Sequence, residues 1–282
     1  MIKLLFPYPA VLIKNKKAST IVIADLHIGW EMALLDKGIH VPTQTPKLLN
    51  KLTALVSEYK PDAILILGDV KHTIATAEMR EWQDVPNFFI ELGKQVKTIQ
   101  VIRGNHDGNL EPLMPESVTV LPATGVTMGE VGFFHGHQWP SPSLLECKTI
   151  IMGHVHPVVA FRDPSGFRII KQVWIKADVN KTLLAEALSK RHKGKREAAS
   201  KDTAQKTRET RATVQQLFIV PSFNDFLGGR PLNETRTYGH VRTEMVAGPV
   251  LRSEAVDMKN AEAYMLDGTF LGTMNQLKAL AS

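Results

Sequence analysis

Histidine, aspartate and asparagine side chains recur in five short motifs within the first 156 residues of the chain. Each motif follows a run of apolar residues, and together the motifs contain six of the ten histidines. In order they are Asp25-Leu26-His27, Gly68-Asp69, Gly104-Asn105-His106-Asp107, Phe134-His135-Gly136-His137 and Gly153-His154-Val155-His156. Imidazole, carboxylate and amide groups together suit a site for two divalent metal ions. The pattern therefore predicts a two-metal centre at the ends of strands.

Two divalent ions held about 3.5–4 Å apart can clamp an in-line displacement at phosphorus from both sides. Such a centre needs a carboxylate that bridges the ions, further ligands for each ion, and open positions for water and phosphate. Asp25 and His27 are two residues apart at a predicted strand end, where both side chains can turn towards one ion. Asp69 follows Gly68, whose conformational freedom lets the backbone bend sharply as it leaves the next strand.

The apolar runs that precede the motifs are predicted to be strands, so the motifs fall at strand ends. Predicted helices alternate with these strands. Strands are predicted at 19–24, 62–67 and 97–102, from their β-branched and aliphatic residues. Helices are predicted at about 30–36, 46–59 and 77–92, with Pro46 in a first turn and Pro86 as a kink or break in the last helix. This βαβαβ order indicates a largely parallel sheet.

After residue 109, short β-like segments separated by turns replace this alternation. They lie near 118–121, 131–134, 149–152, 158–162 and 168–174, with a hairpin connection at 164–166. Strand texture returns at 217–220, and the last forty residues alternate β-like runs with polar turns. We therefore predict an α/β (α+β) fold, a four-layer-like β-sandwich of two mixed sheets flanked by helices.

The ordered motifs resemble the calcineurin-like metallophosphoesterase superfamily, whose pattern is DxH, GD, GNH[DE], a strand-terminal histidine and GHxH. The resemblance covers residues from about 19 to 160 and implies the metallophosphoesterase fold. Residues 24–29, 68–72 and 221–224, the last followed by Gly228-Gly229, are most similar to the archaeal SbcD-related phosphoesterases and the bacterial DNA-ligase-associated phosphoesterases. The chain departs from true SbcD-type nucleases because it lacks a capping domain and a coiled-coil-binding tail, which puts processive work on DNA ends in doubt.

The resemblance also implies a role for each motif residue. One ion would be bound by Asp25, His27 and His156, and the other by Asn105, His135 and His154. Asp69 would bridge the two ions, and a hydroxide between them would attack phosphorus. His106 resembles the acid-base histidine of the family, which protonates the departing alkoxide. A mixed shell of this kind suits Mn²⁺, Fe, Zn²⁺ or Ni²⁺ better than Mg²⁺. Ligand chemistry does not choose among these four, and we expect Mn²⁺.

Four further residues near the motifs have two interpretations each. Asp107 either orients His106 or caps a following helix. His137 either supports the metal ligands without binding an ion itself or contacts the substrate. His72 either contacts the phosphate or is a surface or packing residue. Arg103 either binds phosphate or forms a salt bridge with a neighbouring carboxylate, and the salt bridge is favoured. Trp30 and Trp139 could stack on a nucleobase, but packing is the usual fate of tryptophan, so we leave them out of the site.

These observations predict a phosphoesterase that hydrolyses phosphodiester bonds, with nucleic acid as a candidate substrate. The alternatives are a phosphomonoesterase acting on small phosphorylated molecules and a non-catalytic scaffold that binds nucleic acid. A fold that had become a non-catalytic scaffold would be expected to lose Asp69 or His106 first. Both residues are present, which argues against the scaffold.

The net charge of +6 is concentrated in one segment of the 282 residues. Residues 181–211 contain ten Lys/Arg and four Asp/Glu, and the rest of the chain is balanced. The segment reads as one or two helices broken or frayed at Gly194, or as partly disordered chain. It either contacts nucleic acid, by neutralising phosphates, or is a solvated helical excursion.

We accordingly divide the chain into a core at 1–180, a basic insertion at 181–214 and a β-rich completion of the core at 215–282. No apolar stretch approaches the roughly 20 residues needed to cross a bilayer, and no secretory signal is evident. The single cysteine, Cys147, excludes an internal disulfide framework. We therefore expect a cytoplasmic protein without a membrane partner.

Overall fold

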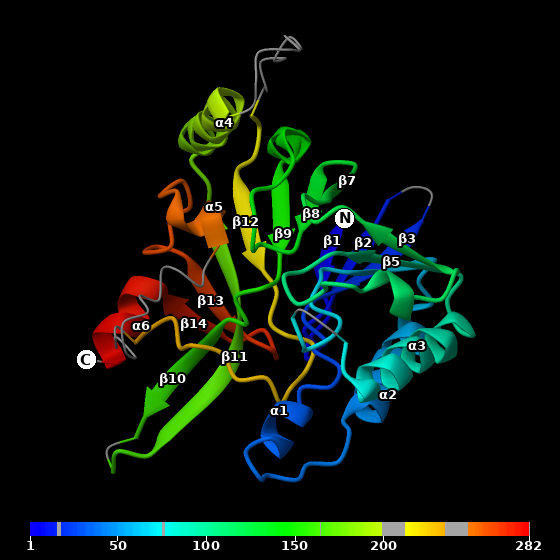
Figure 1. The fold of residues 1–282 in the computed structure, drawn as a ribbon. Coiled ribbons are helices and arrows are strands. Elements are labelled where there is room, and N and C mark those ends of the chain that lie inside the picture. Colours follow the sequence, from blue (N-terminus) through cyan, green and yellow to red (C-terminus); the bar gives the residue numbers. More distant parts are fainter. Residues whose placement is uncertain (16–17, 75–76, 164, 199–211, 235–247, 282) are drawn as a thin grey trace.

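Two β-sheets lie face to face in the computed structural model, and helices cover the outer face of each sheet (Figure 1). The structure describes the chain apart from residues 16–17, 75–76, 164, 199–211, 235–247 and 282. The predicted sandwich of two mixed sheets flanked by helices is confirmed. Among the residues that are described, no helix is both long enough and apolar enough to cross a membrane.

The first sheet contains the predicted parallel unit. Its strand order is β1 (Ile2–Leu4), β2 (Val11–Lys14), β3 (Ser19–Ile23), β4 (Ala63–Ile66), β5 (Thr98–Ile102) and β6 (Val118–Leu121). Strands β3 to β6 are parallel, and β1 and β2 add an antiparallel edge that the sequence analysis did not foresee. Helices α2 (Thr45–Tyr59) and α3 (Met79–Gly93) connect the parallel strands, and α3 continues through Pro86.

The second sheet collects the shorter strands of the rest of the chain. Its order is β14 (Phe270–Thr273), β13 (Glu262–Met265), β11 (Arg168–Asp178), β12 (Gln216–Ile219), β9 (Thr149–Met152), β8 (Val131–Phe134) and β7 (Val126–Met128). Strand β10 (Val158–Arg162) pairs with β11 as the predicted hairpin, although Pro164 in its turn lies outside the described residues. Strands β8, β9 and β12 are parallel neighbours.

Three helices cover the outer face of the second sheet: α4 (Lys181–Ala198), α5 (Gly248–Arg252) and α6 (Met274–Ala281). The expected break at Gly194 is wrong, because α4 continues to Ala198. A helical glycine costs only about 1 kcal/mol, and α4 is anchored by the buried side chains of Leu184 and Leu188. The rest of the basic segment, 199–211, lies outside the described residues. Helix α6 was not foreseen among the predicted β-like runs.

Side chains along the central strands point alternately to the two faces of the sheet, and so contribute to two separate hydrophobic cores. In β3, Ile21 and Ile23 belong to the core that packs under α2 and α3, whereas Val22 faces the second sheet. The core between the sheets includes Phe133 and Trp174 from the second sheet. Because successive side chains of a strand point to opposite faces, a continuous apolar run is what a sheet buried on both faces requires. The sandwich interface therefore fixes where the strand ends of both sheets lie relative to one another.

The core between the sheets gives a direct test of the layering. Replacing the fully buried Phe133 by alanine should lower the free energy of unfolding by about 3–5 kcal/mol, because it leaves a cavity between the sheets. Replacing Phe270, which is 54% exposed on β14, should cost less than about 1 kcal/mol. Urea denaturation followed by circular dichroism measures both, and equal costs would contradict the described packing.

Candidate metal centre

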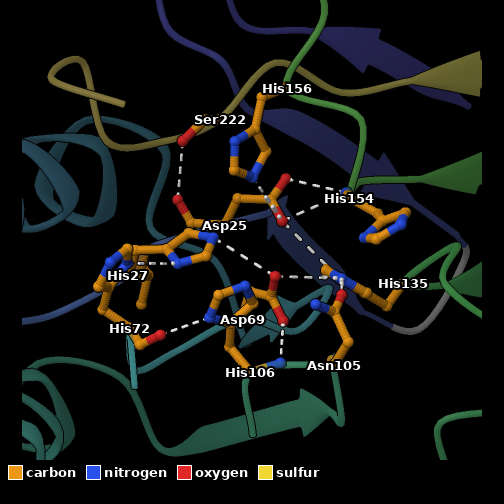
Figure 2. A network of polar contacts seen from close by, with 12 residues as sticks. Asp25, His27, Asp69, His72, Asn105, His106, His135, His154, His156 and Ser222 are labelled. Atoms are coloured by element: carbon orange, nitrogen blue, oxygen red, sulfur yellow. Dashed lines mark hydrogen bonds and ion pairs between the residues drawn. The ribbon is translucent and has the colours of Figure 1, made fainter. Parts of the chain in front are cut away.

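All seven predicted metal ligands meet where strands of the two sheets end (Figure 2). From the first sheet, Asp25 and His27 follow β3, Asp69 follows β4 and Asn105 follows β5. From the second sheet, His135 follows β8, and His154 and His156 follow β9. The carboxyl ends of parallel strands are the usual position of ligand sites in open sheets. In this protein, the carboxyl ends of strands from two different sheets lie next to one another.

Left-handed backbone conformation is concentrated at these ligands. Among the described residues other than glycine, eight have a positive φ, and five of these are predicted ligands: Asp25 (58°), His27 (45°), Asp69 (52°), His154 (70°) and His156 (46°). Such conformations cost about 1–3 kcal/mol each for ordinary residues and cluster at functional sites. The turn out of each strand lets two residues of one motif face the same place, so strain in the backbone accompanies convergence of the ligands.

Asp25, His27, Asp69 and His156 form one group of potential ligands. One side-chain atom from each lies within 4.8 Å of those of the others. His27 Nε2 is 3.3 Å from Asp69 Oδ2, and His156 Nε2 is 3.4 Å from Asp25 Oδ1. Both nitrogens are buried and form no hydrogen bond with the described chain. Buried nitrogens without a hydrogen bond are costly, and here they face carboxylate oxygens, which fits a cation between them.

A second group contains Asp69, His135 and His154, again with ligand atoms within 4.8 Å of one another. Asn105 Oδ1 lies 3.1 Å from His135 Nε2, so the amide joins this group. His135 Nδ1 donates to the carbonyl of Leu67 at 2.5 Å, which leaves Nε2 as the atom that can bind a metal. Asp69 belongs to both groups, and Figure 2 shows His27 and His135 on opposite sides of its carboxylate.

Electrostatics keep the carboxylates of the two groups ionised. Burial raises the pKa of Asp69, but His135 and His27 outweigh it and hold the pKa well below its usual value. For His135, burial lowers the pKa, yet Asp69 and Asp25 raise it to about 9. Burial lowers the pKa of His154 to about 4. The groups therefore contain anionic carboxylates, neutral imidazoles at His27 and His154, and a protonated imidazole at His135, whose proton a metal ion would displace. Burial lowers the pKa of His156, but Asp25 outweighs it and raises that pKa above its usual value.

His106 lies beside the first group rather than between the two groups. Its ring centroid is 4.6 Å from that of His27, and its backbone N–H donates to Asp69 Oδ1 at 2.8 Å. Its Nδ1 donates to the carbonyl of His72, which fixes the ring and leaves Nε2 available for proton transfer. His27, His72 and His106 form a third group of potential ligands, so His72 lies at the site and not at a remote surface.

Asp107 has a role that neither sequence interpretation included. Its buried carboxylate accepts N–H groups from Gly104 at 2.7 Å, Asp69 at 2.8 Å and Val70 at 2.9 Å. Burial, together with Asp69, raises its pKa to about 6. The predicted cap is wrong, because the next helical turn begins only at residue 111. Asp107 instead ties the loop after β4 to the loop after β5.

Arg103 and His137 differ in their distance from the ligands. Arg103 forms a salt bridge with Glu111, as favoured from the sequence. The His137 ring lies 5.2 Å from that of His135, and its buried Nδ1 forms no hydrogen bond with a described residue. Burial lowers the pKa of His137 to about 4. His137 is thus neutral and adjacent to the ligands, but it belongs to none of the three groups.

The loop after β12 supplies contacts that the sequence did not assign. Ser222 Oγ donates to the carbonyl of Asp25 at 2.8 Å, and Asn224 Nδ2 donates to that of Leu26 at 2.9 Å. A pocket of about 380 Å³ opens over the ligands. The later part of the same loop lines it, with Gly228, Gly229, Arg230 and Leu232. Arg230 was not singled out, although an arginine next to two glycines in a turn-rich stretch is a recognisable signal.

Gly104 offers a test of how tightly the loops are packed. A methyl group there would collide with the Asp69 carboxylate and backbone nitrogen. Gly104→Ala should therefore lower the free energy of unfolding by about 1–3 kcal/mol through overpacking. At Gly93, at the end of α3, no described atom beyond the chain neighbours and the nearby helix backbone lies within 4 Å of such a methyl group, so Gly93→Ala should be neutral or stabilising. Denaturant titration compares the two variants, and equal stabilities would show that the loops are loose.

The comparisons with known proteins agree with this geometry. A model of the calcineurin-like phosphoesterase family matches residues 18–173, more than half of the chain. The chain is similar to the solved structure of the nuclease MPE of Pseudomonas putida, at 19% identity and a TM-score of 0.50, covering 95% of this chain and 98% of that one. It is also similar to Yfce, a phosphoesterase from E. coli, at 18% identity and a TM-score of 0.33, covering 51% of this chain and 73% of that one. No curated protein matches the chain in sequence. The chain belongs to the calcineurin-like phosphoesterase family and is a metal-dependent hydrolase.

Proposed function

We propose that this protein hydrolyses phosphodiester bonds with two divalent metal ions, one in each ligand group. The observation that carries the proposal is the position of Asp69, whose carboxylate belongs to both groups. Asp25, His27 and His156 would complete the shell of one ion, and Asn105, His135 and His154 that of the other. When bound, the ions supply a water that is acidic enough to attack phosphorus and positive charge opposite the phosphate oxygens.

The side chains of the pocket divide the remaining work. His106 is fixed by the His72 carbonyl, so its Nε2 can hold a proton for the departing alkoxide. His72 Nδ1 lies 3.3 Å from His27 Nδ1, close enough to contact a phosphate oxygen over the same group. Arg230 lines the pocket, where its guanidinium can pair with a phosphate. Proton transfer would thus come from His106, and charge recognition from His72 beside it and from Arg230 in the loop after β12.

A diester is preferred over a monoester because of the pocket's shape. It is open and extends past the ligands along the loop at 228–232, which leaves room for a second esterified group. The fold is shared over nearly the whole chain with a protein described as a nuclease, which supports nucleic acid as the substrate class. Membership of the SbcD-related group, Mn²⁺ as the metal and contact of 181–211 with nucleic acid remain predictions.

The metal requirement and the substrate class can be tested together. With Mn²⁺, the protein should release p-nitrophenol from bis-p-nitrophenyl phosphate faster than from the monoester, and chelation should abolish both activities. Asp69→Asn should lower kcat by at least about 10³-fold, because the shared ligand weakens for both ions at once. His40→Gln, on the exposed surface, should have no effect. Faster turnover of the monoester would favour the phosphomonoesterase alternative, and no turnover with metal bound would contradict hydrolysis.

The role of His106 predicts a dependence on the leaving group. His106→Asn should lower kcat by about 10²–10⁴-fold for an alkyl ester, whose alkoxide needs a proton to depart. The loss should be much smaller for a p-nitrophenyl ester, because nitrophenolate departs without protonation. Metal content, measured by elemental analysis, should match that of the wild type. Equal losses for the two leaving groups would show that His106 does not act as the acid.

A further inference from the structure

A stacked aromatic pair with one exposed ring lies in two segments that adjoin the metal pocket, and it has no role in the reaction described so far. Phe226 is 49% exposed, and its ring stacks on Trp30 with a centroid separation of 5.7 Å and an interplanar angle of 16°. The ammonium of Lys47 on α2 lies 5.0 Å from the centroid of the Phe226 ring. We call Trp30, Phe226 and Lys47 the aromatic platform. Neither ring belongs to the hydrophobic core clusters of the described chain.

The platform is connected to the metal ligands on both sides. The Trp30 amide donates to the carbonyl of His27 at 3.1 Å, so this ring is one turn away from a ligand. Phe226 lies in the loop after β12, which runs past α1 (Met32–Leu35) in Figure 1, and Gly228 to Arg230 of the same loop line the pocket. At Gly229 a methyl group would collide with the carbonyl of His156, so the loop lies directly against a second ligand. The platform therefore joins the pocket wall through the chain, since Trp30 follows His27 and Phe226 precedes Gly228, and both His27 and Gly228 line the pocket.

Of the basic side chains in these segments, Lys51 has an acidic partner, whereas Lys47 and Arg230 form no ion pair among the described residues. Lys51, one helical turn after Lys47, is paired with Asp225 at 2.6 Å and packs over Phe223. Lys47 and Arg230, by contrast, form no ion pair with any carboxylate that the structure describes. One cation without an acidic partner thus lies over the exposed Phe226 ring, and a second lines the pocket four residues further along the same loop. Aromatic faces that stack bases, combined with cations that follow the backbone, are the recurring elements of single-strand binding.

We propose that the aromatic platform binds a nucleobase next to the scissile phosphate of single-stranded nucleic acid, with Lys47 and Arg230 on the flanking phosphates. This inference rests on the proposed function and names its substrate. The base displaces the Lys47 ammonium from the Phe226 ring, and the ammonium then pairs with a phosphate. Stacking requires a base free of its own stack, so a strand within a duplex would be a poorer ligand. Recognition by stacking is tolerant of base identity.

The test compares a short oligodeoxythymidylate with an abasic strand of equal length, which has the same phosphates but no bases. Two readouts use the full chain: kcat/KM with Mn²⁺, and binding by fluorescence anisotropy in chelator. Phe226→Leu should weaken both readouts about 5- to 150-fold on oligodeoxythymidylate and far less on the abasic strand. Phe226→Tyr should restore them, because the tyrosine ring still stacks.

Phe270→Leu is the matched control. Phe270 is similarly exposed and contacts the ring of Tyr264 at 5.2 Å, but it lies on β14 outside the pocket, so neither strand should be affected. An equal loss on both strands, or no loss on oligodeoxythymidylate, would overturn the proposal. If the wild type cleaves no phosphoester, the proposed function fails, whereas the anisotropy measurement still decides whether Phe226 stacks a base.

The two cations are tested by salt dependence. Arg230→Gln and Lys47→Gln should each reduce the slope of log affinity against log salt by about 0.7, equally for both strands, because each removes one phosphate contact. Lys97→Gln, at the opposite end of β5, should leave the slope unchanged. An unchanged slope for Arg230→Gln and Lys47→Gln would overturn their assignment to phosphates.

Discussion

Hydrogen bonds accepted by Asp107 hold the arrangement of the candidate metal centre. They join the amides of Gly104, Asp69 and Val70, and so tie together two loops that leave adjacent parallel strands. Asp69 is thereby held with its carboxylate between His27 and His135. A buried carboxyl group is costly to leave without partners, and the amides offset that cost. The position of Asp69, which belongs to both groups of potential ligands, thus depends on a residue that belongs to neither.

The sandwich makes the site possible because neither sheet alone supplies all the potential ligands. Three strands of the first sheet and two of the second bring their carboxyl ends together, and the apolar layer between the sheets sets their separation. The same packing offsets backbone strain at the ligands. Burial of large side chains such as Phe133 and Trp174 contributes several kcal/mol, enough to tolerate left-handed conformations at five ligands.

The loop after β12 both supports the Asp25 motif and adds a basic side chain to the pocket. Its first residues hold the backbone of the Asp25 motif through Ser222 and Asn224, and its later residues form the wall with Arg230. The clustered carboxylates and imidazoles would suit any phosphoester, whereas the Arg230 guanidinium and the nearby stretch of loop that contains the exposed Phe226 ring would favour a particular one. In the proposed function, substrate preference would therefore come from the loop, and the reaction from the residues at the strand ends.

The ligand types and the central parallel sheet were predictable from the sequence because their signals are local. Apolar runs ending in Asp25, Asp69 and Asn105 indicate buried strands with polar exits, and the family match agrees with them. The unbroken α4, the amides on Asp107 and the role of the loop after β12 were decided by tertiary structure. Ser222 contacts a residue 197 positions earlier in the chain. Such a contact depends on how two sheets pack, and no spacing or periodicity within a segment encodes it.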